Sequence, residues 1–113
     1  MNIQIFGKSK CFDTKKAERY FRERGIKYQS VDLLKYGISK GEYTSVKAAL
    51  GGFRPLIDTN SAAYKDLHIE YLAREEAVEE RLLESPVLFK TPIVRNGKAA
   101  TVGFVPDVWG LWI

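Results

Sequence analysis

The sequence predicts an α/β fold in which a βαβ unit, a helical segment and a ββα unit follow one another around a mixed sheet. Two observations indicate this order. The first 34 residues contain an alternating segment, an amphipathic segment and a second apolar segment, which is the pattern of a parallel βαβ unit. Near the other end, Asn96-Gly97 separates two short apolar segments, and this dipeptide is a strong signal of a β-hairpin.

The N-terminal unit consists of three predicted elements. Residues 2–6 alternate between apolar and polar side chains and predict a short strand. Residues 12–24 have apolar side chains at helical spacing, and Gly25 provides a stop signal. Residues 26–34 predict a second strand, which we expect to pair in parallel with the first.

The middle of the chain is predicted to be helical. Ser39 and Glu42 have the spacing of a capping box ahead of an amphipathic helix. Asn60 or Ser61 can cap a short helix, and a further helix is expected over about residues 75–84.

The C-terminal unit begins after this helical segment. Residues 93–95 and 98–102 predict the two strands of the hairpin, and Pro106 suits the first position of a last helix. The elements fit a thioredoxin-like sheet with a helical insertion over about residues 36–90, in a single domain of residues 1–113.

Composition excludes several classes of function. The net charge is +4, but basic and acidic residues are interleaved, so we expect a solvated helix surface and no direct nucleic-acid interface. No apolar run is long enough to span a bilayer, and we expect a cytoplasmic protein without membrane contact. The single cysteine excludes an internal disulfide. One cysteine and one histidine make no metal cluster, and we expect His68 on the surface.

Cys11 is the residue that we expect to carry chemistry, as the catalytic nucleophile. It follows a strand and opens a helix, where unpaired amides and the helix dipole favour a thiolate. Lys8, Lys10 and Lys15 are close in the sequence and favour the anion further, whereas Asp13 opposes it. We expect the amides and cations to prevail and to lower the pKa of the thiol. The alternative is an inert, buried cysteine.

Two further positions bear on this thiol. Thr14 occupies the place of the second cysteine of a dithiol motif, so turnover requires an outside thiol such as glutathione or a partner protein. Thr91-Pro92 lies just before the hairpin, where a cis proline would turn the chain toward the thiol, although the sequence leaves the isomer open.

Several segments resemble the ArsC/Spx/YffB group of the thioredoxin superfamily. They are IQIFG, CFDTKKAERYFRERGI, NSAAYKDL and SPVLFKTPIVRNGKAATVGFVPDVW. Together they cover nearly the whole chain in the order found in that group. The resemblance implies an ArsC-like thioredoxin fold with a helical insert and a cis Pro92 beside Cys11. The residues expected to stabilise the thiolate or bind substrate are Lys8, Thr14, Lys15, Asn60, Thr91 and Pro92.

Activities differ within the group. ArsC-type arsenate reductases hold the oxyanion with three arginines, which bind it bidentately, and then use glutathione and glutaredoxin. In this chain Thr91 stands before the proline, Asp58 and Thr59 stand near Asn60, and no arginine is near Gly103. The basic residues that could substitute are Arg54, Lys90 and Arg95. The resemblance therefore implies an arsenate reductase-related monothiol oxidoreductase, without a bound cofactor, that is turned over by glutathione or glutaredoxin.

Two alternatives follow from the same resemblance. Spx-type members bind the C-terminal domain of the RNA polymerase α subunit and usually carry a Cys-x-x-Cys switch. Thr14 removes that switch, whereas binding would not require it. The chain is thus either a thiol oxidoreductase, an Spx-like RNA polymerase-binding regulator, or a scaffold in which the thiol has no role.

Overall fold

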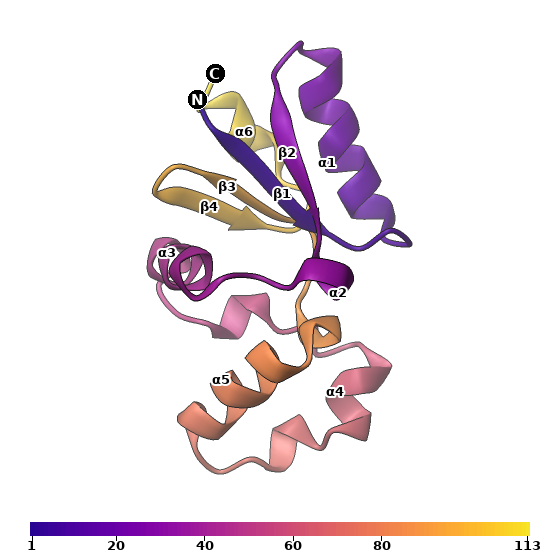
Figure 1. Ribbon diagram of the computed structural model, residues 1–113, viewed down its shortest axis with the longest axis vertical. Helices are drawn as coiled ribbons and strands as arrows, with labels where there is room; N and C mark the ends of the chain where they lie inside the picture. The colour runs from indigo at the N-terminus through magenta and orange to yellow at the C-terminus, as the bar shows by residue number, and fades with distance from the viewer.

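A four-stranded mixed sheet forms the centre of the computed structural model, which describes all residues 1–113 (Figure 1). The strands are β1 (Ile3–Gly7), β2 (Tyr28–Asp32), β3 (Ile93–Asn96) and β4 (Ala99–Val102), in the order β2-β1-β3-β4. β1 pairs in parallel with β2 and antiparallel with β3, which pairs antiparallel with β4. The predicted βαβ unit and hairpin are both confirmed.

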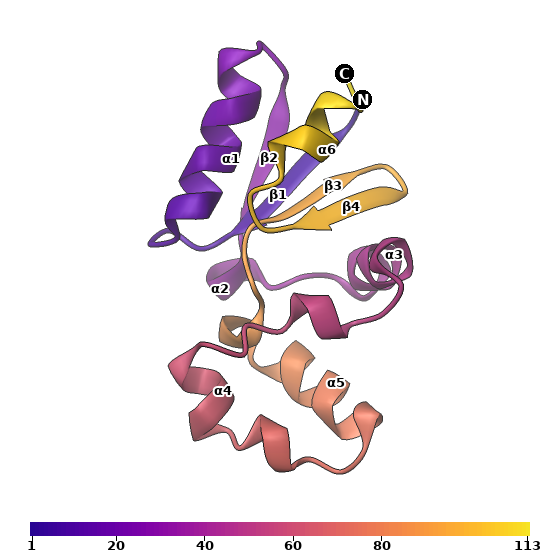
Figure 2. The ribbon, with the colours of Figure 1, turned by 180° about the vertical axis from the view of Figure 1, so that it is seen from behind.

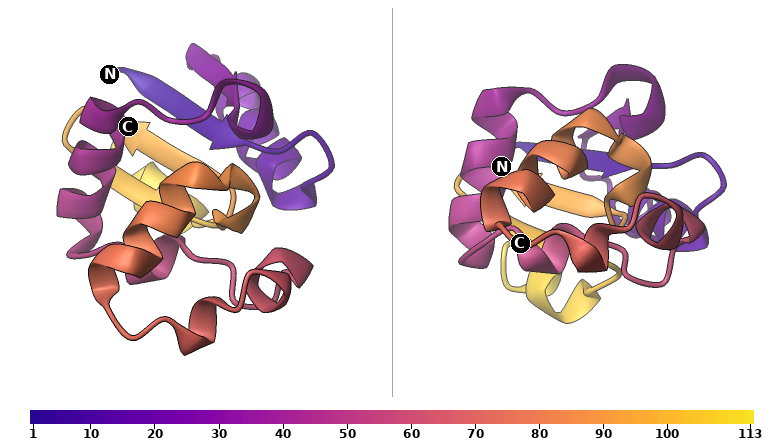
Figure 3. Two further views of the ribbon diagram at one scale, coloured as in Figure 1. Left: turned by 60° about the horizontal axis from the view of Figure 1, so that its bottom comes forward. Right: turned by 90° about the horizontal axis from the view of Figure 1, so that it is seen from below.

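Different helices cover the two faces of the sheet (Figures 1 and 2). One face packs against α1 (Phe12–Glu23) and α6 (Pro106–Gly110), and the other packs against α3 (Lys40–Leu50) and the rest of the helical insertion. The insertion also contains α2 (Leu33–Tyr36), α4 (Ala62–Asp66) and α5 (Glu75–Glu84). Seen from below, the insertion lies in front of the sheet (Figure 3). No helix is both long and apolar enough to cross a bilayer.

β1 separates two hydrophobic cores. Ile3 and Ile5 pack with Phe21 and Trp109 between the sheet and the pair α1 and α6. Phe6 points to the opposite face and belongs to the larger core, which the insertion covers. This division follows from the alternation of side chains along a strand. The strand that leads to Cys11 is therefore held from both sides.

β2 is shorter than the predicted strand over residues 26–34. At one end the Ile26 amide donates to the Phe21 carbonyl at 2.9 Å and so belongs to the end of α1. At the other end the Asp32 carboxylate accepts from the Leu34 and Lys35 amides and caps α2. Local capping thus overrides the apolar pattern, and the helical insertion begins before residue 36.

The predicted helix caps are confirmed within the insertion. Ser39 Oγ accepts from the Glu42 amide, and the Glu42 carboxylate accepts from the Ser39 amide, which completes the capping box. Of the two candidates for the next cap, Ser61 accepts from the Tyr64 amide and begins α4. Asn60 lies one residue before this cap.

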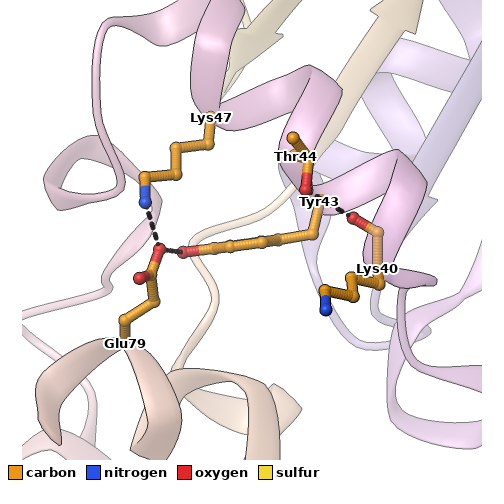
Figure 4. A network of polar contacts seen from close by, with 5 residues as sticks. All are labelled: Lys40, Tyr43, Thr44, Lys47 and Glu79. Carbon is orange, nitrogen blue, oxygen red and sulfur yellow. Dashed lines mark hydrogen bonds and ion pairs between the residues drawn. The ribbon is translucent and has the colours of Figure 1, made fainter. Parts of the chain in front are cut away.

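One polar network joins α3 to α5 (Figure 4). The Tyr43 hydroxyl and the Lys47 ammonium each donate to the same oxygen of Glu79 at 2.6 Å. The hydrogen bonds from Lys47 and Tyr43 hold the pKa of the Glu79 carboxyl below its usual range. This contact fastens the outer helix of the insertion to the helix that packs on the sheet.

We expect Glu79→Gln to lower the free energy of unfolding at pH 7 by about 1 kcal/mol, because the neutral amide oxygen accepts both hydrogen bonds more weakly than the carboxylate does. The depressed pKa of Glu79 means that its contribution is present above the unfolded carboxyl value of about 4.3 and is lost as the pH falls through the lower folded value. Urea unfolding of both proteins at pH 7 and pH 3 should show a difference that narrows in acid. Glu80→Gln, at an exposed position of the same helix, is the control, and an equal loss there would contradict the prediction.

Candidate functional site

Cys11 lies in the loop between β1 and α1, at the N-cap position of α1. A turn in which its amide donates to the Lys8 carbonyl at 3.0 Å brings the chain from the end of β1 into the helix. The side chain is half-buried. The first amides of a helix have no partner in a preceding turn, so this position presents N–H groups to the sulfur. The structure therefore shows a partly accessible thiol at the helix start.

The thiol faces the chain just before β3. Its Sγ donates to the Thr91 carbonyl at 3.6 Å, across 80 positions of sequence. The peptide bond between Thr91 and Pro92 is cis, which confirms the isomer implied by the family resemblance. The Thr91 amide donates to no backbone carbonyl. Thr91 and Cys11 thus form the two sides of the site.

Hydrogen bonds decide the acidity of Cys11. Burial by itself raises the pKa of the thiol, but the hydrogen bonds that the Thr14 and Thr91 side chains and the Thr14 and Asp13 amides can donate to the thiolate outweigh it and bring the pKa below its ordinary value. The direction agrees with the sequence prediction. The groups that produce it are the hydroxyls and amides around the sulfur, rather than the neighbouring lysines on which that prediction largely relied.

The absence of a side chain at Gly7 leaves room for Thr14 near the sulfur. The Thr14 side chain is 6% exposed and packs directly on Gly7. A Cβ at Gly7 would lie 2.2 Å from Thr14 Cγ2, which leaves no room for any other residue. The buried Thr14 Oγ1 has no hydrogen-bond partner, so its hydrogen is available to a thiolate. Sequence reasoning missed this packing role of Gly7, because no local pattern marks it.

A pocket of about 410 Å³ lies beside the thiol. Its lining is mixed in charge and contains no arginine: Lys8, Ser9, Lys10, Cys11, Leu34, Asp58 and Thr91. Bidentate binding of an oxyanion needs guanidinium groups, and the Asp58 carboxylate opposes an anion. Leu34 and Asp58 were not predicted as site residues, because only the fold brings them to Cys11.

The structure brings together some of the predicted site residues. Lys8, Thr14 and Thr91 surround Cys11, and Pro92 follows Thr91.

Two predicted residues lie elsewhere. Lys15 lies over the Phe12 ring, with its ammonium 5.9 Å from the ring centroid. It lines a neighbouring pocket, which Lys8 and Thr14 also line but Cys11 does not. Asn60 lines a pocket beside α4. His68 is exposed, as predicted.

The candidate replacements for the reductase arginines are not at the thiol. Arg54 pairs with Glu75 at 3.7 Å. Arg95 donates to Gln4 and Ser45 beneath the sheet. Lys90 is exposed and does not line the pocket.

No group of three or more acidic, histidine or cysteine side chains is placed to hold a metal ion.

Thr14→Val is expected to raise the pKa of Cys11 and to slow its alkylation at pH 7 severalfold, because the variant keeps the shape but removes the hydroxyl that stabilises the thiolate. The rate of reaction with iodoacetamide, measured from pH 5 to 10, gives the pKa. Thr14→Ser retains the hydroxyl and serves as the control. Identical profiles for the valine variant and the unmodified protein would contradict the role of Thr14.

The profile of the ArsC family matches residues 6–110. Global transcriptional regulator Spx 2 of Oceanobacillus iheyensis is 30% identical over 112 residues, which are 95% of this chain and 80% of the relative. The uncharacterized protein YusI of Bacillus subtilis is 24% identical over 95% of this chain and 94% of its own length.

Solved structures agree with these matches. The arsenate reductase from Vibrio cholerae superposes with a TM-score of 0.83 at 23% identity, over 96% of this chain and 94% of that chain. This likeness supports the thioredoxin-like fold seen in the mixed sheet. The profile match, the Spx relative and the helix-start cysteine together show that the chain belongs to the ArsC family.

Proposed function

We propose that this ArsC-family chain is a monothiol oxidoreductase in which the Cys11 thiolate attacks a disulfide sulfur and glutathione or a glutaredoxin restores the thiol. The carrying observation is the partly accessible sulfur at the start of α1, whose pKa is lowered by hydrogen bonds from Thr14, Thr91 and the helix amides. A lowered pKa increases the fraction of thiolate at neutral pH, and the thiolate is the attacking species.

The reaction is an exchange of thiols. The Cys11 thiolate attacks a mixed disulfide between glutathione and a substrate thiol, so that a Cys11–glutathione disulfide forms and the substrate leaves as a thiolate. A second glutathione thiolate then attacks the bound glutathione sulfur. This step releases oxidised glutathione and regenerates the Cys11 thiolate. In this scheme the Thr14 hydroxyl and the helix amides stabilise that leaving thiolate. The Thr91 amide, which donates to no backbone carbonyl, binds the backbone of the disulfide substrate.

Arsenate is a poorer substrate for this site. The pocket has no arginine to hold an oxyanion, and Asp58 contributes a negative charge. Lys8 and Lys10 are cations, but an ammonium binds as a point charge rather than through two parallel hydrogen bonds. Charge and geometry therefore favour a disulfide over arsenate.

The test is formation of a mixed disulfide. The protein is incubated with oxidised glutathione, and the intact mass is measured before and after addition of reduced glutathione. We expect one glutathionyl group on Cys11, removed by the reduced form. Cys11→Ser is the control and should gain none. A protein that stays unmodified under conditions that modify a model peptide thiol would contradict the proposal.

A second candidate is a regulatory protein that binds RNA polymerase through its α subunit. The observation in its favour is the 30% identity with a protein named as the global transcriptional regulator Spx 2. Thr14 leaves this chain without a dithiol switch, so such binding would not be controlled by an internal disulfide. Titration with the isolated C-terminal domain of the α subunit tests it. Binding that survives Cys11→Ser would support the regulator, and absence of a complex would reject it.

A further inference from the structure

Lys8 makes an unusual contact for a lysine in a loop beside a catalytic thiol. Its ammonium donates to two backbone carbonyls, to Val87 at 2.8 Å and to Phe89 at 2.7 Å. Both carbonyls belong to the end of the helical insertion, 79 and 81 residues away in sequence. An ammonium has three donors, and two are used here. Lys8 therefore joins the loop that carries Cys11 to the segment that leads into Thr91.

The segment is held from its other side by a short antiparallel contact. The Asp58 amide donates to the Leu88 carbonyl at 2.8 Å, and the Lys90 amide donates to the Leu56 carbonyl at 2.7 Å. This pairing also brings the Asp58 carboxylate into the pocket of the thiol. The Phe89 carbonyl lies between these two hydrogen bonds and accepts from the Lys8 ammonium.

The contacts close a ring around the sulfur. The Lys8 carbonyl accepts from the Cys11 amide at 3.0 Å, and the Lys8 ammonium donates to the Phe89 carbonyl. Two residues after Phe89, the Thr91 carbonyl accepts from Cys11 Sγ. Hydrogen bonds from a charged donor are stronger than those between neutral groups. The strongest bond of the ring is thus the one made by Lys8.

We propose that Lys8 is a positioning residue, whose ammonium clamps residues 87–91 against the Cys11 loop and so holds Thr91 at the thiol. The inference rests on the proposed function, in that the thiol held in place is the nucleophile. A lysine that acted only as a nearby charge would stabilise the thiolate directly, whereas this ammonium acts on the thiol by holding Thr91 in place. Lys10 lines the same pocket and makes no such hydrogen bond, and it provides the comparison.

The clamp should respond to the state of the sulfur. Burial lowers the pKa of the Lys8 ammonium, whereas Asp58 and Cys11 attract the cation and raise it. The other charges near the sulfur are Lys10 in the same loop and Asp13 in the first turn of α1. Conversion of the thiolate to a neutral adduct removes one anion that attracts Lys8. Because coupling between two sites is reciprocal, the adduct should loosen residues 87–91.

Amide hydrogen exchange of the full chain tests the clamp directly. The Asp58 and Lys90 amides report on the held segment. We expect Lys8→Met to exchange there about tenfold faster, as loss of charge-assisted hydrogen bonds predicts. Lys8→Arg should restore most of the protection, and Lys10→Met should leave it unchanged.

The alkylation profile of Cys11 supplies a second readout. Both methionine variants remove one positive charge near the sulfur, but only Lys8→Met should also release Thr91, whose side chain lowers the pKa of the thiol. We therefore expect a larger upward shift of the Cys11 pKa for Lys8→Met than for Lys10→Met. Equal shifts together with unchanged exchange would overturn the proposal and leave Lys8 as a simple charge.

The unmodified protein provides a version of the test that needs no variant. Exchange at Lys90 is compared before and after Cys11 is alkylated with iodoacetamide at a pH where the free sulfur is ionised. Faster exchange in the alkylated protein supports the clamp, and equal exchange overturns it. Neither measurement uses glutathione. If no mixed disulfide forms with glutathione, only the oxidoreductase proposal is rejected. If amide exchange at Lys90 is unchanged, only the clamp is rejected.

Discussion

Gly7→Ala is expected to destabilise the protein by about 1 to 3 kcal/mol, the usual cost of an added methyl group in a packed core. The new Cβ would lie 2.2 Å from Thr14 Cγ2 and 2.8 Å from Thr14 Oγ1, so Thr14 must move. Its hydroxyl would then leave the sulfur, and the pKa of Cys11 should rise. One substitution at a residue without a side chain thus changes both stability and reactivity. Urea unfolding and the pH profile of alkylation measure the two effects.

A matched glycine is present in α3. A Cβ at Gly41 would meet nothing within 4 Å, so Gly41→Ala should raise stability by about 0.5 to 1 kcal/mol through the helix propensity of alanine. The same change would leave the Cys11 profile unaltered. If Gly7→Ala proves as stable as the unmodified protein and equally reactive, Thr14 has no fixed place at the thiol.

Trp109→Ala is expected to cost about 3 to 5 kcal/mol, as other large-to-small aromatic changes in cores do. Trp109 is fully buried and packs against Tyr20, Phe21 and Phe104. Its indole N–H donates to Thr101 Oγ1 at 2.8 Å, so the substitution also leaves a buried hydroxyl without its donor. Domains of this size have a total stability of about 5 to 15 kcal/mol. The variant should therefore be close to unfolding at 37 °C.

Thermal unfolding followed by circular dichroism measures this loss. Leu111→Ala, at a position 85% exposed, is the control and should change stability by less than about 0.5 kcal/mol. A small effect of Trp109→Ala would mean that α6 does not contribute to the core between α1 and the sheet.

The elements predicted best were those with local signals. The capping box at Ser39, the Asn96-Gly97 turn and Pro106 at the start of α6 are short-range patterns with one favoured structure. Leu33 and Leu34 were wrongly predicted as strand because the Asp32 carboxylate caps α2 within a segment that otherwise has the composition of a strand. The error moved only the end of β2 and left the topology intact.

The site was harder to predict than the fold. Cys11 could be singled out because its position follows from the order of strand and helix. Asp58 reaches the pocket only through pairing of its segment with Leu88, and no sequence pattern marks that pairing. Lys15 and Asn60 were named from proximity in the sequence or in the family pattern, and the fold turns both toward other pockets. Sequence distance is a poor guide to distance from a sulfur.

Thr14, packed on Gly7 in the place of a second thiol, also determines the kinetics of any disulfide formed on Cys11. In a dithiol protein the neighbouring cysteine resolves such a bond at an effective concentration in the millimolar range, whatever the surroundings contain. Here every resolving step is a collision between two molecules. The lifetime of the oxidised chain therefore scales inversely with the concentration of free thiol around it, and the fraction oxidised follows that concentration continuously instead of switching.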